Sequence, residues 1–458
     1  MPRAPAGQGG LALPEAGRLN FAHFDHLSED LRIDGRPVRL VYLYCAAPDY
    51  RVFGDPDEGI SCVDDVARAA VLCLRHHEIA GDEASRRRAV GLLGFVLRMQ
   101  APNGLFHNFV LDRELTIHRD HVRSRADRLD WWSARAMWAL GTACRVLAGV
   151  DDALADRCHQ AARGLLPHVG NLLTRHASFE EYHGRRVPAW LIHGDGADAT
   201  SELLLGLTAL RQARPDRALD RMIACLAQGL EAMRYGSMNR FPYGLHASNR
   251  RGWHAWGNAQ AQALVEAGRP RSARAEARHF YPRLLVEGLA ASIDFDDPAA
   301  SSDDERIAYG VRCMTLGLVR LFETTGDLDY ARMAGLAGAW FLGNNIAGRP
   351  MYDAATGRTY DGLSAAGVIN PHSGAESTVE GLYALLEVGR HPAAAEWLTA
   401  RGEPPRKQIV AGRPLWWRGF TRPPGGPADR LAVVMDLDSE TMQVLAGDDL
   451  QAFLDRAG

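Results

Sequence analysis

Residues 61–80 read SCVDDVARAAVLCLRHHEIA, and this stretch decides the predicted fold. Between Val63 and Leu74, apolar residues recur at i, i+3, i+4, i+7, i+8 and i+11, which is the period of an α-helix. Ala69, Leu72 and Cys73 fill the opposite side, so the helix is apolar around most of its circumference. The stretch therefore predicts a helix that is buried among other helices.

The same period recurs along the chain and predicts six pairs of helices. The expected ranges are 61–80 with 84–100, 129–148 with 151–176, 197–212 with 215–235, 254–267 with 271–292, 303–325 with 328–343, and 374–388 with 392–401. Pro167 is expected to kink or split the helix over 151–176. Connections are short within pairs and mostly long between them. This alternation predicts an all-α fold, an (α/α)6 toroid of six helical hairpins in which the first helix of each pair lines the inside. An open solenoid would show a fixed repeat length, and these pairs vary in length.

Three parts of the chain are expected to be organised differently. Residues 1–17 are predicted to be a flexible N-terminus, and 18–403 the barrel domain, with a strand-like lead-in at 38–44. Residues 404–458 are predicted to be a C-terminal extension that packs on the barrel. The strand-like segments 408–410 and 431–435 lie in this extension, so small β additions are expected at both ends of the toroid.

Composition excludes several classes of function. The net charge is −4, and the only basic run is Arg86-Arg87-Arg88, so no nucleic-acid partner is expected. No stretch approaches 18 consecutive apolar residues and the N-terminus lacks an apolar signal region, which predicts neither a membrane partner nor a secretory signal. Seven scattered cysteines without a CxxC pair predict reduced thiols rather than a metal site. We therefore expect a cytoplasmic protein without metal or cofactor; the sequence leaves its oligomeric state open.

Acidic and aromatic side chains gather at the starts of the expected inner helices. In chain order they are Asp64 and Asp65; Asp130, Trp131 and Trp132; Asp198 and Glu202; Trp253, His254, Trp256 and Asn258; Asp303, Asp304 and Glu305; and His372 and Glu376. Helix capping explains single acids, because a carboxylate in the first turn answers the helix dipole. Ser61 with Asp64, and Ser373 with Glu376, have the spacing of a capping box, and Asp130 is a plausible N-cap. Capping does not explain four indoles around one opening, although one of each close pair can equally be a core residue.

A cleft that combines carboxylates with indoles is typical of carbohydrate binding, because aromatic faces stack on sugar rings and carboxylates bind hydroxyls. The candidate catalytic residues are Asp64, Asp65, Asp130 and Glu376. The candidate substrate-binding residues are Trp131, Trp132, Glu202, Trp253, His254, Trp256, Asn258 and His372. Adjacent carboxylates repel, so we expect a raised pKa for either Asp64 or Asp65. The alternative is that one of the two caps the helix while the other pairs with Arg68 or Arg135.

With these features, residues 60–402 resemble the six-hairpin (α/α)6-barrel glycosidase-like superfamily. The resemblance lies in the hairpin count, in Val63-Asp64-Asp65-Val66-Ala67-Arg68-Ala69 and in Asp130-Trp131-Trp132. The tandem aspartates are similar to the catalytic pair of the α-mannanase branch, which implies that Asp64 and Asp65 are nucleophile and acid/base in either order. His372-Ser373-Gly374-Ala375-Glu376-Ser377 is also similar to a segment of this barrel. The expected function is hydrolysis of an oligo- or polysaccharide.

Three other functions remain open at this point. A polysaccharide lyase would need a Tyr or His base and a group that neutralises a uronate, which Tyr243, His246, His254, Asn258, Tyr309 and Arg250-Arg251 offer. A terpene cyclase is suggested by Val63-Asp64-Asp65-Val66-Ala67, but Cys62 replaces the outer Asp of that motif and the repeated Gln-Trp pattern is missing. A glycan-binding protein that has lost its chemistry would keep the same barrel.

Overall fold

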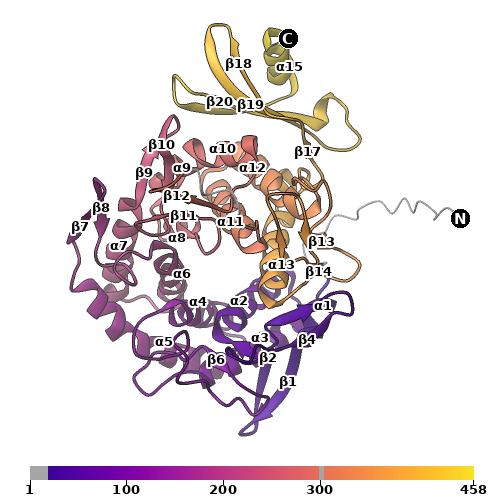
Figure 1. Ribbon diagram of the computed structural model, residues 1–458. Helices are drawn as coiled ribbons and strands as arrows, with labels where there is room; N and C mark the ends of the chain where they lie inside the picture. Colours follow the sequence, from indigo (N-terminus) through magenta and orange to yellow (C-terminus); the bar gives the residue numbers. More distant parts are fainter. Residues whose placement is uncertain (1–18, 299–303, 458) are drawn as a thin grey trace, which may run out of the picture.

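The computed structural model describes residues 19–298 and 304–457, and the helices in these ranges form a closed ring (Figure 1). Each inner helix packs on the next, and the last packs on the first. The six inner helices of the described ranges are α2 (Val63–Ala80), α4 (Trp131–Val146), α6 (Ala197–Ala213), α8 (Gln260–Glu266), α11 (Ala308–Thr325) and α13 (Ala375–Gly389). The six-hairpin toroid predicted from the sequence is confirmed.

An outer layer of helices returns along the outside of this ring. Its members are α3 (Glu83–Arg98), α5 (Asp152–Leu173), α7 (Arg217–Ala232), α9 (Pro270–His279) with α10 (Tyr281–Glu287), α12 (Leu328–Gly338), which continues as a 3-10 turn at Ala339–Leu342, and α14 (Pro392–Ala395). Inner helices pack closely where small residues meet. At the α4–α6 contact, a Cβ on Gly141 would lie 2.2 Å from the carbonyl oxygen of Gly206, so this approach requires glycine.

Several expected helix boundaries are wrong. The helix expected from residue 254 begins only at Gln260, because 252–254 form a strand and Gly257 adopts a left-handed φ of 68°. The helix expected over 271–292 is split at Phe280, since Pro282 lacks the N–H that an unbroken helix needs. Pro167, in contrast, lies inside an unsplit α5. The helix expected from 303 begins at Ala308, Asp303 lies outside the described residues, and α14 ends at Ala395, short of 401.

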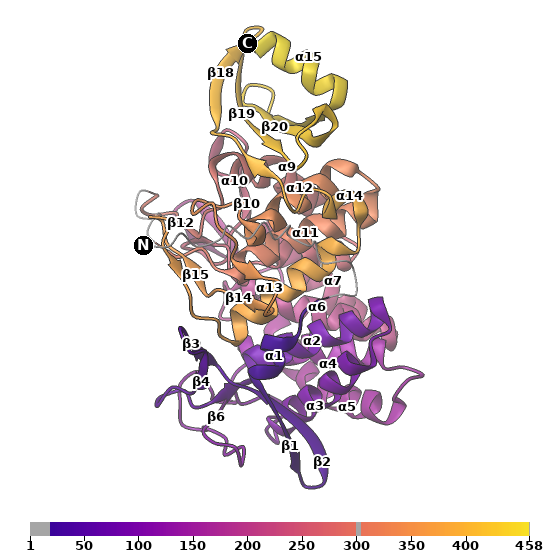
Figure 2. The ribbon, with the colours of Figure 1, turned by 90° about the vertical axis from the view of Figure 1, so that its right-hand side faces the viewer.

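The long connections fold into small two-stranded sheets, most of them not anticipated from the sequence. They are β5 (Ser61–Cys62) with β6 (Phe109–Val110), β7 (Phe179–Tyr182) with β8 (Arg185–Pro188), β9 (Arg234–Ser237) with β10 (Arg240–His246), β11 (Gly252–His254) with β12 (Ser292–Asp294), β13 (Tyr352–Asp353) with β14 (Arg358–Thr359), and β15 (Gly362–Leu363) with β16 (Ile369–Asn370). In Figure 2, strands β6, β12 and β15 lie on the left-hand side of the ring, together with β3 (Tyr44–Ala46) and β4 (Arg51–Phe53). We call this side the long-loop face.

The N-terminal lead-in joins the same face. After α1 (Ala22–His26), the chain forms the hairpin β1 (Ser28–Ile33) with β2 (Arg36–Val41), then the hairpin β3 (Tyr44–Ala46) with β4 (Arg51–Phe53). The strand-like lead-in expected at 38–44 falls in β2 and the start of β3. Residues 1–17, expected to be flexible, lie outside the described residues.

A sheet at the C-terminal end lies at the edge of the ring, above α10 and α12 in Figure 1. Its strands are β17 (Arg401–Gly402), β18 (Arg406–Val410), β19 (Arg413–Thr421), β20 (Arg430–Asp436) and β21 (Thr441–Ala446). The segments expected to be strand-like at 408–410 and 431–435 lie within β18 and β20. Helix α15 (Gly447–Ala457) covers the sheet, and Trp417 and Phe453 belong to a small core of their own there. None of the described helices is both long and apolar enough to cross a membrane.

Candidate active site

A cavity of about 450 Å³ opens where the inner helices begin, on the long-loop face. Its walls come from five parts of the chain that are far apart in sequence. The lining residues are Leu43, Tyr44, Glu58, Cys62, Asp64, Asp65, Arg68, Phe109, Arg123, Arg135, Trp256, Ile307, Tyr309 and Glu376. The N-terminal helix ends carry partial positive charge, which favours the acidic residues gathered here.

The two aspartates at the start of α2 point to different partners. Cys62 is the N-cap of the helix: its Sγ accepts a hydrogen bond from the Asp65 backbone N–H at 3.4 Å. Asp64 forms an ion pair with Arg135 at 2.7 Å, and its Oδ2 accepts a hydrogen bond from Asn108 Nδ2 at 2.9 Å. Asp65 bonds to Arg68 instead. The capping box expected from Ser61 and Asp64 is not formed, because Ser61 Oγ accepts from the Val41 N–H.

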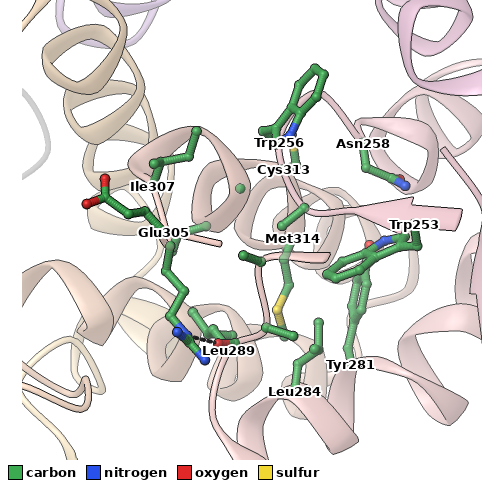
Figure 3. Close-up of a pocket in the computed structure, with 16 residues that line it drawn as sticks. Trp253, Trp256, Asn258, Tyr281, Leu284, Leu289, Glu305, Ile307, Cys313 and Met314 are labelled. Carbon is green, nitrogen blue, oxygen red and sulfur yellow. Dashed lines mark hydrogen bonds between the residues drawn. The ribbon is translucent and has the colours of Figure 1, made fainter. Parts of the chain in front are cut away.

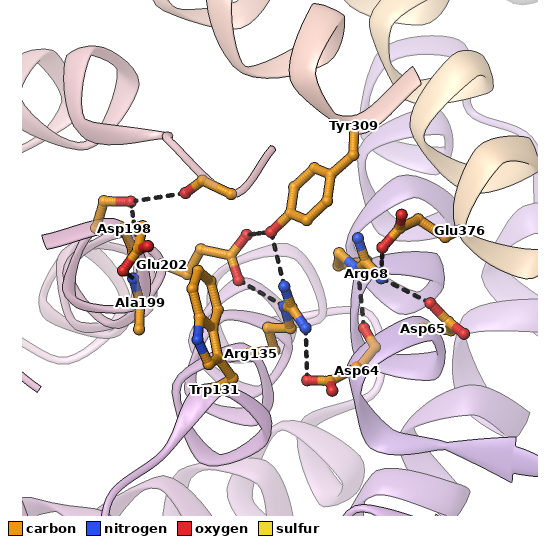
Figure 4. Close-up of polar contacts among 12 residues, drawn as sticks. Asp64, Asp65, Arg68, Trp131, Arg135, Asp198, Ala199, Glu202, Tyr309 and Glu376 are labelled. Atoms are coloured by element: carbon orange, nitrogen blue, oxygen red, sulfur yellow. Dashed lines mark hydrogen bonds and ion pairs between the residues drawn. The ribbon is translucent and has the colours of Figure 1, made fainter. Parts of the chain in front are cut away.

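Arg68 lies between three carboxyl groups, one from α2 and two from α13. Its Nη2 donates to Asp65 Oδ1 at 2.6 Å and to Glu376 Oε2 at 3.1 Å (Figure 4). Its Nη1 donates to Glu380 Oε1 at 2.9 Å. Glu376 is the open member of this group, with 43% of its side chain exposed. Glu380 is buried, so Arg68 joins a carboxylate of the core to two carboxyls of the cavity.

Arg135 forms the neighbouring part of the cavity floor. It contacts Asp64 on one side, and on the other its Nε donates to Glu202 Oε2 at 2.8 Å and its Nη2 to the Tyr309 hydroxyl at 2.9 Å (Figure 4). The Tyr309 hydroxyl in turn donates to Glu202 Oε1. Glu202 is fully buried, so this expected substrate-binding residue lies beneath the cavity and holds Arg135 and Tyr309 in place.

The acidity of the Asp65 carboxyl group is strongly altered by its surroundings. Burial raises the pKa of Asp65 to about 6, against the opposing charge of Arg68, and the nearby Glu376 and Asp64 carboxylates add to the rise. The expected rise of one pKa in the tandem pair is therefore found, but its main cause is burial rather than repulsion between neighbours. A carboxyl group with a pKa near 6 can hold a proton and release it close to neutral pH.

The expected ring of four indoles is reduced to two. Trp256 lines the cavity and is 41% exposed, and Trp131 packs between it and Arg135, 5.9 Å from the Trp256 ring and 4.6 Å from the guanidinium. Trp132 and Trp253 are buried in the core, which corrects the expectation that they bind substrate. Successive side chains on a helix point about 100° apart, so Trp131 and Trp132 cannot both face the cavity.

Trp253 and Asn258 belong to a second, smaller hollow of about 30 Å³, which shares Trp256 and Ile307 with the cavity (Figure 3). Its lining is mostly apolar and includes Leu284 and Met314. Asn258 is buried and donates through Nδ2 to the His246 carbonyl and to Ser248 Oγ, so it stabilises the loop before α8.

Three other candidate residues form structural contacts around the cavity rather than lining it. Asp130 is the N-cap of α4, accepts from the Trp131 N–H at 2.8 Å and pairs with His193 at 3.0 Å, as the capping interpretation predicted. His254 contacts Asp198 through Nε2 at 2.9 Å and the Trp256 carbonyl through Nδ1 at 2.7 Å. His372 accepts the Ala47 N–H through Nδ1 at 3.0 Å. Neither Asp130, His254 nor His372 lines the cavity.

The residues that suited a lyase are also engaged elsewhere. His246 is fully buried between Glu276 and Ser272, at 2.8 Å from each. Arg250 is paired with Asp195 and Glu180. Tyr309 does reach the cavity, but its hydroxyl is committed to Glu202 and Arg135.

The contributions of the N-terminal lead-in and of Asn108 to the cavity were not predicted from the sequence. Tyr44 and Glu58 form part of the cavity wall, and Asn108 binds both the backbone and the side chain of Asp64. The available signal for Tyr44 was its place at the end of the strand-like segment predicted over 38–44. Across residues 19–298 and 304–457, no group of three His, Cys, Asp or Glu side chains is placed to hold a metal ion.

Known proteins resemble this chain in fold but not in sequence. No family model and no curated protein matches the sequence. Cellobiose 2-epimerase from Bacillus thermoamylovorans B4167 superposes with a TM-score of 0.55 at 14% identity, over 79% of this chain and 94% of that one. Cellobiose 2-epimerase from Spirochaeta thermophila DSM 6192 gives 0.50 at 11% identity, over 76% and 90%. A D-mannose isomerase gives 0.51 at 14% identity, over 76% and 91%. The chain shares the six-hairpin (α/α)6 fold of these proteins.

Proposed function

We propose that this chain is a carbohydrate-active enzyme, and specifically a glycoside hydrolase that uses Asp65 as its proton donor. The observation that carries the proposal is the pKa of Asp65, which burial raises to about 6 in a cavity that also holds Asp64 and Glu376. Glycoside cleavage needs one protonated carboxyl group and one ionised carboxylate on either side of the scissile bond. The names of the fold neighbours, two sugar epimerases and a sugar isomerase, support the substrate class.

In the proposed first step, Asp65 transfers its proton to the glycosidic oxygen as the bond from that oxygen to the sugar carbon breaks. The negative charge left on Asp65 lies 2.6 Å from Arg68 Nη2, so the guanidinium stabilises the ionised product of the transfer. In the same step the second carboxylate of the cavity forms a bond to that sugar carbon. In the second step, water attacks the carbon, the bond between the carbon and the second carboxylate breaks, and the ionised Asp65 takes the proton of the water.

Glu376 is our choice for the second carboxylate. It is the open carboxyl of the Arg68 cluster, and Arg68 engages its Oε2. Because the Asp65 and Glu376 oxygens bond to the same nitrogen, they lie within about 6 Å of each other, nearer the spacing of about 5 Å in retaining enzymes than that of inverting ones. Glu376 would then be the nucleophile. Asp64, engaged by Arg135 and Asn108, would fix the Arg135 side of the cavity.

A second candidate is epimerisation or isomerisation of a reducing sugar, favoured by the fold neighbours. That chemistry removes a proton from carbon, which needs a base with a free lone pair. One imidazole beside the cavity is that of His254, which stacks on the lining residue Trp256 with ring centroids 3.7 Å apart. Both of its ring nitrogens already face oxygens, of Asp198 and of the Trp256 backbone, and for this reason we favour hydrolysis.

One experiment separates these functions. The purified protein and the Asp65→Asn and Glu376→Gln variants are incubated with a glycan library in deuterated water. Hydrolysis predicts new reducing ends that both variants fail to produce, without unsaturated ends and without deuterium on carbon. Deuterium next to the carbonyl carbon would indicate epimerisation, and ultraviolet-absorbing ends a lyase. Binding without any product would leave a glycan-binding protein and end the proposal of catalysis.

A further inference from the structure

A pair of aromatic rings at the edge of the cavity has no part in the proposed reaction. Tyr44 and Phe53 are direct partners across the β3–β4 hairpin, with ring centroids 5.5 Å apart and planes inclined by 25°. They are 37% and 42% exposed. Tyr44 lines the cavity, and Phe53 extends the aromatic surface beyond the lining.

The hairpin that carries these rings is fixed to the barrel. The Ser373 N–H donates to the Cys45 carbonyl at 3.1 Å and the Ala47 N–H to His372 Nδ1 at 3.0 Å, which ties the hairpin to the segment that leads into α13. The Tyr44 hydroxyl donates to Glu58 Oε2 at 2.7 Å. The aromatic pair therefore holds a constant position relative to Glu376, which lies in the first turn of α13.

A cross-strand aromatic pair also stabilises a hairpin, and this is the simplest account of Tyr44 and Phe53. That account does not explain where the exposed aromatic residues of this protein are found. Among the described residues, the large apolar side chains with high exposure include four aromatic ones, Tyr44, Phe53, Phe179 and Trp256. Two of these line the cavity and a third stacks on Tyr44. Exposed apolar surface concentrated at one opening indicates a binding site.

We propose that Tyr44 and Phe53 form a second sugar-binding subsite, at the edge of the cavity, which stacks on the sugar unit next to the scissile bond. This proposal rests on the proposed hydrolase function and specifies its substrate. The reactive unit occupies the cavity beside Asp65, and the leaving-group unit lies with an apolar ring face on the aromatic pair. The substrate is therefore an oligosaccharide or a polysaccharide chain end, and a monosaccharide glycoside with a small leaving group uses only half of the site.

Binding measurements test the subsite independently of turnover. Calorimetry with the Asp65→Asn variant compares cello-, manno-, xylo- and maltotetraose, each with its own monosaccharide. We expect at least one tetrasaccharide to bind about tenfold more tightly than its monosaccharide, the gain that one aromatic stacking contact provides. Adding Phe53→Ala should remove this advantage and leave the monosaccharide affinity unchanged.

Matched variants separate stacking from damage to the hairpin. Phe53→Trp keeps a flat ring and should keep the advantage, and Phe179→Ala removes an exposed aromatic side chain that does not line the cavity and should change nothing. The proposal is overturned if no tetrasaccharide exceeds its monosaccharide, or if Phe53→Ala leaves the advantage intact. A tetrasaccharide that binds through Phe53 but is cleaved by no form of the protein would end the hydrolase proposal alone.

Discussion

Each end of the barrel holds a cluster of arginines and carboxyl groups, but an arginine is shared in one cluster and a carboxylate in the other. At the long-loop end, one arginine, Arg68, is shared by the three carboxyls of Asp65, Glu376 and Glu380. At the other end, a cavity of about 200 Å³ adjoins Glu387, and this one carboxylate is shared by three arginines. Arg75 Nε lies 2.8 Å from Glu387 Oε1, while Arg320 Nη1 and Arg390 Nε lie 2.9 and 3.1 Å from Oε2.

The pKa values follow these proportions. Burial raises the pKa of Asp65 to about 6, and one shared arginine does not offset it. Burial alone would raise the pKa of Glu387 as well, but the charges of Arg320 and Arg75 hold it at about 2. Helix direction explains the distribution, because the inner helices end near the second cavity and their carbonyl ends favour cations. For Asp65 and Glu387, the number of arginines that share the carboxyl group decides whether burial raises its pKa or the arginines lower it.

The largest effect is expected for Asp65→Asn. Loss of the proton donor should lower turnover about 1,000-fold, within the range of general acid catalysis. Stability should not fall, because a raised folded-state pKa means that ionised Asp65 costs about 3 kcal/mol at pH values above 6, and the amide removes that cost. Turnover of the substrate found in the glycan screen and urea unfolding at pH 7 measure both effects. An active variant would refute the role of Asp65 as the acid.

Glu387→Gln should show the reverse pattern. The folded-state pKa of Glu387 is lowered, so its contribution to stability is present above pH 4.5 and is lost as the pH falls through about 2. Neutralising it should cost about 3 kcal/mol of unfolding free energy at pH 7 and leave turnover unchanged. Urea unfolding at pH 7 and at pH 3 should show the difference between wild type and variant shrinking at the lower pH. A variant with full stability would show that the three arginines do not depend on this carboxylate.

The helical period of the sequence was enough to locate Asp64 and Asp65 at the start of an inner helix, since it depends only on local spacing. The different environments of the two aspartates could not be predicted, because Glu376 and Glu380, which share Arg68 with Asp65, lie 308 and 312 residues from Arg68 along the chain. The burial of Trp132 and Trp253 could not be predicted either, because the sequence does not show which of two tryptophans close together in the chain faces the core. Tyr44 lines the cavity because the hairpin that carries it packs against residues near 373, and this contact between distant parts of the chain cannot be seen in the local sequence pattern.

A smaller effect is expected at Asp130, on the rim of the catalytic end. Its carboxylate caps α4 and pairs with His193, so Asp130→Ala should cost about 1 kcal/mol of stability, the usual loss of an N-cap. Turnover should remain, because the side chain lies outside the cavity lining. Asp130→Asn, which can still cap the helix, should lose less stability than Asp130→Ala. A loss of turnover in both variants without a loss of stability would instead support a catalytic role for Asp130.

The smallest effect is expected at one hydrogen bond, between the Cys62 thiol and the Asp65 carboxyl group. Cys62 Sγ lies 3.3 Å from Asp65 Oδ2, and burial holds the pKa of the thiol well above its usual range, so the thiol stays protonated and donates. A thiol is a weak donor, whereas Glu387 is held by charged ones. Cys62→Ser supplies a stronger donor to the ionised form and should lower the pKa of Asp65 by about 0.5 unit. Cys62→Ala removes the donor and should raise that pKa. Because Asp65 acts as an acid, turnover falls as the pH rises through its pKa, so the alkaline limb of the profile reports both shifts. Shifts in the same direction for serine and alanine would show that Cys62 acts through packing, and that burial alone separates the two ends of the barrel.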